Sequence, residues 1–150
     1  MIPFPNKKYK TIYADPPWLE SGGGKIKRGA DRHYSLMKTQ DIKNLPVQSI
    51  ADDDCWLFMW VTNNFLKDGL DIMEHWGFRY ITNIVWVKDR FGIGYYFRGQ
   101  HEICLFGVKG KLKPKVKNQS TVVFDKRHKH SAKPNQMYFK IENVSHEPRI

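Results

Sequence analysis

The segment Tyr9-Lys-Thr-Ile-Tyr-Ala14, followed by Asp15-Pro-Pro-Trp18, decides the fold of this chain. Residues 9–14 are rich in β-branched and aromatic side chains and contain no breaker, which predicts a buried strand. Asp15 then stands at the carboxyl end of that strand, where open α/β sheets hold their ligands. The segment therefore predicts both a strand of the sheet and a ligand site directly after it.

The turn after this strand is rich in hydrogen-bond acceptors. Pro16 and Pro17 have no backbone N–H and a fixed φ, so their carbonyl oxygens point in set directions. Together with the ionised Asp15 carboxylate they favour an amino group over a carbonyl, and Trp18 offers a flat face for a planar heterocycle. We expect a ring with an exocyclic amine, adenine or cytosine before guanine or uracil. The alternative interpretation is a rigid turn with Trp18 packed on the core.

The composition is typical of one soluble globular domain over residues 1–150, with 41% hydrophobic and 27% charged residues. No stretch approaches the ~18 consecutive apolar residues of a membrane span, and the first residues lack a signal-peptide pattern, so we expect a cytoplasmic protein. Cys55 and Cys104 lie in apolar runs and predict buried free thiols. The net charge of +10 favours a polyanionic partner, although a solvated basic face explains it equally well.

Strands and helices alternate along the chain, which predicts an α/β sheet fold. After the first strand we expect further strands over 55–61, 78–88, 101–108 and 121–124. Helices are expected from a Thr39 cap to before residue 46, from an Asn63 cap to residue 76, and over 134–144. Residues 52–54, three aspartates, predict a solvated turn. No metal site is expected, because His128 and His130 have no third ligand nearby in the sequence.

Two basic segments are candidate phosphate-binding elements. The glycine-rich residues 21–29 predict a basic loop beside the Asp15 site, although an inert surface loop fits the same residues. Its candidate contacts are Lys25, Lys27 and Arg28.

The second basic segment covers residues 109–117, in which lysines alternate with other residues. Alternate residues of an extended chain share one side, so Lys111, Lys113 and Lys115 form a candidate phosphate rail. Pro114 favours an edge strand or loop, and a lysine-rich edge also protects a sheet against aggregation. The aromatic loop of residues 91–97 could stack on bases, with packing against the sheet as the alternative.

Six motifs taken together resemble the adenine-N6 methyltransferases, which include the catalytic subunit of the mRNA adenosine methyltransferase and related bacterial and phage DNA methyltransferases. The motifs occur in order over almost the whole chain. They are Ala14-Asp-Pro-Pro-Trp18, His33-Tyr34-x-x-Met37, Leu57-Phe-Met-Trp-Val-Thr62, Ile84-Val-Trp-Val-Lys88, His101-Glu-x-Cys-Leu-x-Gly-Val-Lys-Gly110 and His130-Ser-x-Lys-Pro134.

The resemblance implies a Rossmann-like class I methyltransferase fold with permuted motif order, in which the catalytic motif precedes the main cofactor-binding part. It implies S-adenosylmethionine as the methyl donor and the amine of adenine as the acceptor, held by Asp15 and the backbone of Pro16 and Pro17, with Trp18 fixing the ring. Lys133 is expected at the cofactor with His130 and Ser131 of the same motif, and Tyr34 with the nucleic acid. Family members continue into a further strand after the helix at 134–144, so we expect that last strand to be missing here.

We therefore expect S-adenosylmethionine-dependent methylation of the exocyclic amine of adenine in nucleic acid, with DNA favoured over RNA. One alternative is a partner subunit that binds nucleic acid but is impaired in catalysis. A second alternative is a cytosine amino-methyltransferase, which shares the acceptor logic. Those enzymes usually carry serine and tyrosine where this chain has Asp15 and Trp18.

Overall fold

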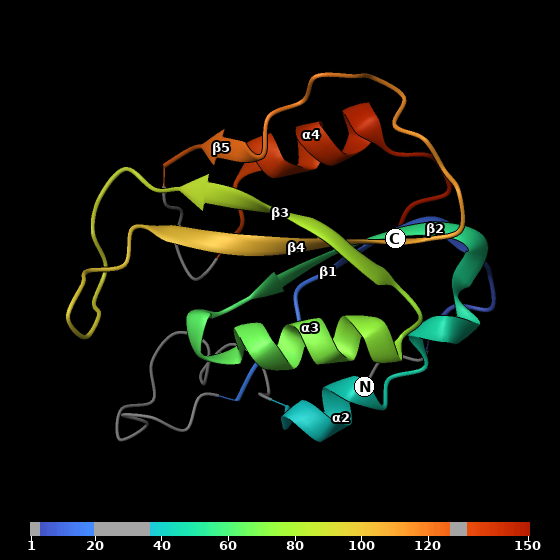
Figure 1. Cartoon of the computed structure of the whole chain (residues 1–150), viewed down its shortest axis with the longest axis horizontal. Helices are drawn as coiled ribbons and strands as arrows, with labels where there is room; N and C mark the ends of the chain where they lie inside the picture. Colours follow the sequence, from blue (N-terminus) through green and yellow to red (C-terminus); the bar gives the residue numbers. More distant parts are fainter. Residues whose placement is uncertain (1–3, 20–36, 127–131) are drawn as a thin grey trace.

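A computed structural model of the chain describes residues 4–19, 37–126 and 132–150. Five strands form one mixed sheet in the order β1-β2-β4-β3-β5. Helices α2 and α3 pack on one face of the sheet and α4 packs on the other (Figure 1). The predicted α/β sheet is thus confirmed at this level. The strands are β1 (Tyr9–Ala14), β2 (Ala51–Val61), β3 (Arg79–Val87), β4 (His101–Lys109) and β5 (Val122–Phe124), and the helices are α2 (Thr39–Lys43), α3 (Leu66–His75) and α4 (Asn135–Val144).

Strand β2 lies inside the sheet, and residues 55–61 are all buried as the sequence predicted. Alternate side chains enter two separate cores. Leu57 and Met59 join the core under α2 and α3, whereas Phe58 and Trp60 join the core under α4. Each large side chain removed from water contributes about 1.5–3 kcal/mol. The two cysteines, on β2 and β4, are buried free thiols as predicted.

Strand directions bring several chain ends to one edge of the sheet. β1 runs parallel to β2, with Ala14 opposite Met59. β4 runs antiparallel to both β2 and β3, and Glu102 near its start faces Trp86 near the end of β3. The carboxyl ends of β1, β2 and β3 therefore meet the amino end of β4, and we call this the site edge.

The acidic turn predicted at residues 52–54 is wrong, because β2 already begins at Ala51. The three carboxylates stay near the surface at this end of the strand. Asp52 Oδ1 accepts a hydrogen bond from the backbone N–H of Asp54 (3.2 Å) and lies 3.6 Å from Lys10 Nζ. Asp54 Oδ1 accepts the backbone N–H of Lys111 (2.8 Å), which fastens the segment after β4.

Two helix starts differ in detail from the expected caps. Lys38, not Thr39, occupies the N-cap position of α2. Asn63 begins a short 3-10 turn, η2 (Asn63–Phe65), and α3 follows it. No helix in the described part of the chain is long and apolar enough to cross a bilayer.

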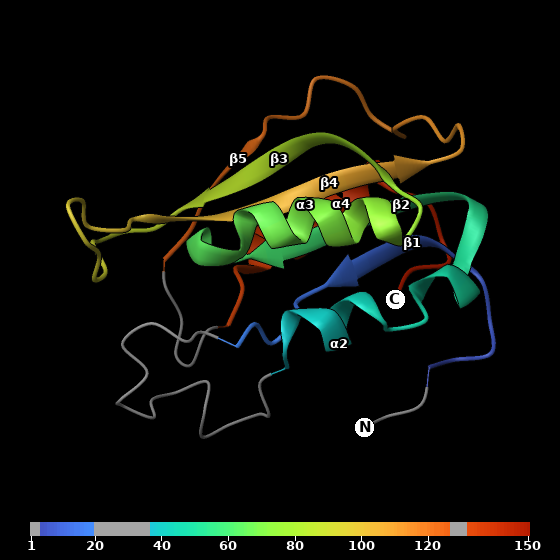
Figure 2. The same ribbon diagram turned by 60° about the horizontal axis from the view of Figure 1, so that its bottom comes forward.

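Residues 148–150 lie alongside β1, in the same direction as that strand (Figure 2). The backbone N–H of Ile150 donates to the Thr11 carbonyl (3.0 Å), and the N–H of Tyr13 donates to the Ile150 carbonyl (2.8 Å). The edge of β1 that faces away from β2 thus accepts parallel pairing.

The close approach of α3 to the sheet depends on Gly69. A Cβ at this position would overlap Val61 Cγ1 and lie 3.2 Å from Leu105 Cδ1. We expect Gly69→Ala to destabilise the fold by about 1–3 kcal/mol, because overpacking exceeds the gain in helix propensity. Urea unfolding measures this difference. Gly99→Ala is the control, because its Cβ would meet only the Ile93 carbonyl oxygen at 3.6 Å; equal stability of the two variants would contradict the packing argument.

Candidate functional site

Asp15 follows the last residue of β1 and projects from the site edge. Its side chain is 53% exposed, whereas Pro16 directly after it is buried. The carboxylate Oδ2 lies 4.0 Å from Lys133 Nζ, which belongs to the residue pair just before α4. The structure thus brings together two residues that the sequence predicted for one site, 118 positions apart in the chain.

Glu102 on β4 connects Lys133 to a second lysine. Its Oε1 lies 2.7 Å from Lys133 Nζ, and its Oε2 lies 2.6 Å from Lys88 Nζ. All three side chains are at least three-quarters buried. Burial by itself raises the pKa of Glu102, but the two ammonium groups outweigh it and lower the pKa below its ordinary value. Glu102 is therefore a fixed anion between two cations.

Two indoles support the lysines. Lys133 Nζ lies 5.0 Å from the ring centre of Trp60, and Lys88 Nζ lies 5.0 Å from that of Trp86. The indoles meet edge to face at 6.2 Å, and Trp60 Nε1 donates to the Tyr13 hydroxyl (2.8 Å). Cation–π contacts of this kind place each ammonium group without neutralising it. The two lysines of the site therefore lie on a pair of indole rings that contact each other.

The pKa of Asp15 is raised above its ordinary value of 3.8. The first cause is withdrawal of the carboxylate from water by the surrounding protein; the Lys133 ammonium opposes it, and the Glu102 carboxylate adds to it. Half of the side chain is nevertheless open to solvent, which moderates the effect. Folding therefore disfavours the charged form of the Asp15 side chain, which points outward from the site edge.

Trp18 does not offer the open ring face that the sequence predicted. The indole is only 5% exposed, stacks on Phe65 with ring centres 5.3 Å apart, and donates Nε1–H to the Trp60 carbonyl (3.0 Å). The alternative of a ring packed on the core is therefore correct for Trp18. It anchors the turn beside β2, and we treat it as a positioning residue rather than as a base-stacking residue.

The two proline carbonyls are also less free than expected. The Pro16 carbonyl accepts the backbone N–H of Trp18 (2.9 Å), and the Pro17 carbonyl accepts that of Met37 (2.8 Å). The amide donors missing from the prolines are supplied by the residue after them and by a segment farther along the chain. Each carbonyl oxygen has a second lone pair, so a further donor can still bind.

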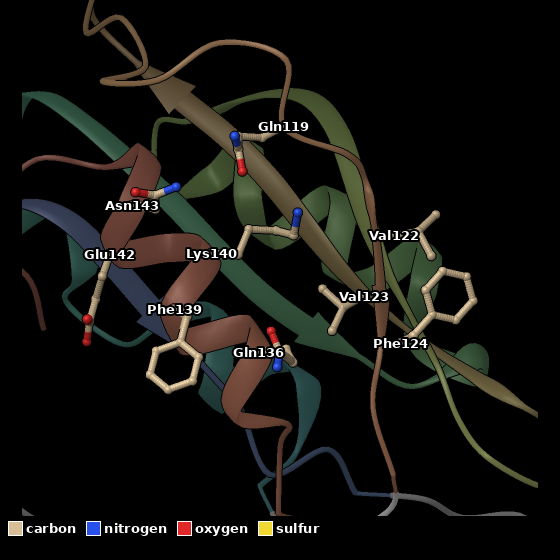
Figure 3. Close-up of a pocket in the computed structure, with 9 residues that line it drawn as sticks. All are labelled: Gln119, Val122, Val123, Phe124, Gln136, Phe139, Lys140, Glu142 and Asn143. Atoms are coloured by element: carbon tan, nitrogen blue, oxygen red, sulfur yellow. The ribbon is translucent and has the colours of Figure 1, made fainter.

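A cleft of about 290 Å³ opens beside the Asp15 turn. Its walls are mostly apolar and come from β1, the N-terminal segment, the region after α2, the end of α3 and the segment after α4; they include Pro16, Ile12, Phe4, Val47, Trp76 and Ile150. A larger cavity of about 630 Å³ lies elsewhere, between β5 and α4, and Figure 3 shows its lining. Of these two, the smaller cleft is lined by Asp15, Pro16 and Pro17 of the predicted site, and Lys133 and Trp18 are not among its lining residues.

Six predicted site residues lie outside the described ranges, and their placement stays a prediction. They are Lys25, Lys27, Arg28, Tyr34, His130 and Ser131. His128 lies outside these ranges as well. Among the described residues, no group of three or more His, Cys, Asp or Glu side chains has an arrangement that could hold a metal ion.

The lysine rail is an exposed loop, but it lies away from the site edge. Lys111, Lys113 and Lys115 are exposed, and the segment is fastened by the bond from the Lys111 N–H to Asp54. Asp54 precedes Met59, the partner of Ala14, by five residues on β2. At ~3.4 Å per residue the rail therefore starts about 17 Å from the Asp15 turn.

Glu102 and Lys88 belong to two of the six motifs, but the sequence did not predict them as site residues. Nothing in their local sequence indicates that they share an ion pair, because the antiparallel pairing of β3 and β4 creates the contact. One weak signal was present: a carboxylate and a lysine at the ends of two apolar strands are expected to pair if those strands are neighbours.

Comparison with known proteins identifies the family of this mixed α/β chain, whose sheet-edge site contains two carboxylates and two lysines. The sequence profile described as MT-A70 matches residues 9–149. The chain is 35% identical to the type II methyltransferase M.MunI of a Mycoplasma species, over 87% of this chain and 64% of that protein. It is 29% identical to the human N(6)-adenosine-methyltransferase catalytic subunit METTL3, over 92% of this chain and 24% of that protein.

This chain belongs to the MT-A70 family. One relative is named as non-catalytic: the chain is 32% identical to the N6-adenosine-methyltransferase non-catalytic subunit MTB of Arabidopsis thaliana, over 71% of this chain and 15% of that protein. The chain spans just under two thirds of the length of M.MunI and about a quarter or less of METTL3 and MTB.

The raised pKa of Asp15 predicts the effect of removing its charge. A carboxyl whose pKa is raised by folding stabilises the fold below its unfolded pKa, and this contribution is lost as pH rises through the folded pKa. We expect Asp15→Asn to be more stable than the wild type near neutral pH, with the difference disappearing towards about pH 4. Urea unfolding at a series of pH values tests this. Asp71→Asn on the exposed face of α3 is the control, and an Asp15→Asn variant less stable than wild type at neutral pH would contradict the prediction.

Proposed function

We propose that this chain carries the catalytic site of an S-adenosylmethionine-dependent methyltransferase that acts on the exocyclic amine of adenine in nucleic acid. The observation that carries the proposal is the outward-facing Asp15 carboxylate, 4.0 Å from a lysine that Glu102 holds in place. The names of the relatives, a type II methyltransferase and adenosine N6-methyltransferases, support the reaction. We favour DNA over RNA as substrate, since M.MunI matches with the higher identity and over the larger share of its length.

We further propose that the sheet is a Rossmann-like methyltransferase sheet in permuted order. Parallel β1 and β2 next to the antiparallel β4 agree with this arrangement. The parallel pairing of residues 148–150 with β1 also supports it. In the proposed arrangement the part after α4 returns to the outer edge of β1, the strand that leads into Asp15, as residues 148–150 do here.

The described residues provide what the methyl acceptor needs. The adenine amine is a weak nucleophile, because its lone pair is delocalised into the ring. Hydrogen bonds from the amine to the Asp15 carboxylate and to the free lone pair of the Pro16 carbonyl favour a pyramidal nitrogen, in which the lone pair is available. The carboxylate also stabilises the positive charge that develops on the nitrogen during transfer. Trp18 would not contact the adenine; it anchors the turn that orients both acceptors.

The residues at the site edge also fit the methyl donor. S-adenosylmethionine, when bound, supplies an electrophilic methyl group on a sulfonium. The mostly apolar cleft along β1 suits a ring and an aliphatic chain, and Asp15, whose charge complements a cation, is one of the residues that line it. Lys133 would hold the carboxylate group of the donor, because Glu102, which places its ammonium group, shares one negative charge between Lys133 and Lys88.

A second candidate is a partner subunit that binds nucleic acid without turnover, and the similarity to the non-catalytic subunit MTB favours it. The intact Asp15-Pro-Pro-Trp18 motif argues for catalysis, since a subunit without turnover has no need for the outward-facing carboxylate. Calorimetry with S-adenosylmethionine separates the two candidates. Binding supports the catalytic assignment, and absence of binding supports the partner subunit.

The central test is Asp15→Ala. We expect this variant to lose transfer of a labelled methyl group to adenine-containing oligonucleotides by at least about 100-fold, because it removes the main electrostatic stabilisation of the amine. Nucleic-acid affinity, measured by fluorescence anisotropy, should stay within about twofold, since one carboxylate among many cations contributes little to it. Parallel DNA and RNA oligonucleotides identify the substrate. Equal loss of binding and transfer would make Asp15 a structural residue.

The position of the lysine rail predicts a length-dependent contribution to binding. Its distance of about 17 Å from the Asp15 turn corresponds to about five nucleotides at ~3.4 Å each. Charge reversal of Lys111, Lys113 and Lys115 should therefore weaken binding and flatten its salt dependence for long oligonucleotides only. Oligonucleotides that extend fewer than about five nucleotides from the target should bind normally. An unchanged salt slope at every length would assign these lysines to solubility.

A further inference from the structure

The loop between β3 and β4 exposes aromatic side chains that none of the described residues cover. The sequence left two interpretations of this loop, base stacking and packing against the sheet, and the structure excludes packing. Its five large side chains are among the most exposed hydrophobic groups of the described residues. They are Phe91 (63% exposed), Ile93 (85%), Tyr95 (92%), Tyr96 (103%) and Phe97 (85%).

Backbone and side-chain hydrogen bonds hold the loop in a defined conformation, although its large side chains are exposed. Lys88 N–H donates to the Gln100 carbonyl (2.9 Å), Gln100 Nε2 donates back to the Lys88 carbonyl (3.2 Å), and Gly92 N–H donates to the Gly99 carbonyl (2.6 Å). A Cβ at Gly94 would overlap the Phe97 carbonyl oxygen, so the chain doubles back tightly there. Tyr96 has a φ of 59°, in the left-handed region that a tyrosine rarely adopts.

The base of the loop belongs to the site edge. Lys88 closes the neck and is also the lysine that pairs with Glu102. Glu102 in turn holds Lys133 opposite Asp15. Figures 1 and 2 both show the loop projecting past the end of the sheet at which β3 ends and β4 begins. A polymer bound with one base at Asp15 would therefore run close to these rings.

The charges next to the rings indicate which partner they fit. Arg90 and Arg98 flank the aromatic run; the side chain of Arg90 is 74% exposed and Arg98 is also exposed. Aromatic faces interleaved with cations match nucleobases and phosphates. The net charge of +10 adds to this complementarity.

We propose that this aromatic loop stacks on unpaired bases next to the target nucleotide. The proposal rests on the proposed function, because it requires nucleic acid at the Asp15 site. A base that leaves the stack to reach Asp15 leaves its neighbours without a stacking partner. Tyr95, Tyr96 and Phe97 replace that partner, and Arg90 and Arg98 bind the adjoining phosphates.

The test compares a loop variant with a matched control. The loop variant is Tyr95→Ala/Tyr96→Asn/Phe97→Ala, in which asparagine tolerates the left-handed φ of position 96. The control is Phe124→Ala/Phe139→Ala, which removes two exposed rings (73% and 61%) from β5 and α4. Fluorescence anisotropy with a single-stranded, adenine-containing oligonucleotide of about 20 nucleotides measures affinity. We expect binding to weaken at least about tenfold in the loop variant and to stay unchanged in the control.

Photo-cross-linking identifies the contact directly. The same oligonucleotide with scattered 5-iodouracil should cross-link wild-type protein within residues 91–98, the tryptic peptide bounded by Arg90 and Arg98. Normal affinity of the loop variant, or cross-links only elsewhere, would overturn the proposal. If wild-type protein self-associates in analytical ultracentrifugation, and the loop variant does not while its nucleic-acid binding is intact, the loop is a protein contact and the proposal is overturned.

The methyl-transfer assay separates this proposal from the proposed function. If wild-type protein methylates adenine and the loop variant binds normally, only the loop assignment fails. If wild-type protein does not methylate but its loop cross-links to the oligonucleotide, the proposed function fails, and the loop is then a nucleic-acid contact without a target nucleotide at Asp15.

Discussion

The arrangement of charged side chains at the site edge depends on the two ion pairs of the Glu102 carboxylate. It receives one lysine from the end of β3 and another from the entry to α4, at 2.6 and 2.7 Å. Without this anion two ammonium groups would face each other in a largely buried space, where an unpaired charge costs far more than at the surface. Through Lys133 the contact reaches Asp15, and through Lys88 it reaches the neck of the aromatic loop. One carboxylate therefore connects the lysine opposite Asp15 with the lysine at the neck of the aromatic loop.

Much of the sheet could be predicted from the sequence, because its strands have strong local signals. The continuous apolar run of residues 55–61 and the β-branched run before Asp15 match β2 and β1 closely. The aspartates at 52–54 misled the prediction, since their polarity is typical of a turn. Here they belong to β2 at the point where its register with β1 shifts, between the pairs Tyr9–Ala51 and Thr11–Trp56, and the Asp54 carboxylate accepts the backbone N–H of Lys111. Local polarity does not show which strand lies alongside.

For the candidate site, the sequence predicted the role of Asp15 but not the contacts of the side chains around it. The chemistry of Asp15 follows from its own residue type and its place after a strand. The burial of Trp18 does not, because an indole in a turn packs inward or outward according to what the fold brings next to it, and here that is Phe65 and the carbonyl of Trp60. The roles of Glu102 and Lys88 are likewise created by strand pairing, which sequence spacing alone does not specify.

The two buried thiols have a practical consequence. Cys55 and Cys104 have no exposed surface, and burial raises the pKa of both. A thiol reacts as its thiolate, so both side chains resist alkylating reagents and oxidants while the protein stays folded. Since the sequence has just these two cysteines, a single cysteine placed on the surface becomes a selective attachment point for a dye or spin label. The native chain is thus already suited to distance measurements in solution, without prior removal of its own thiols.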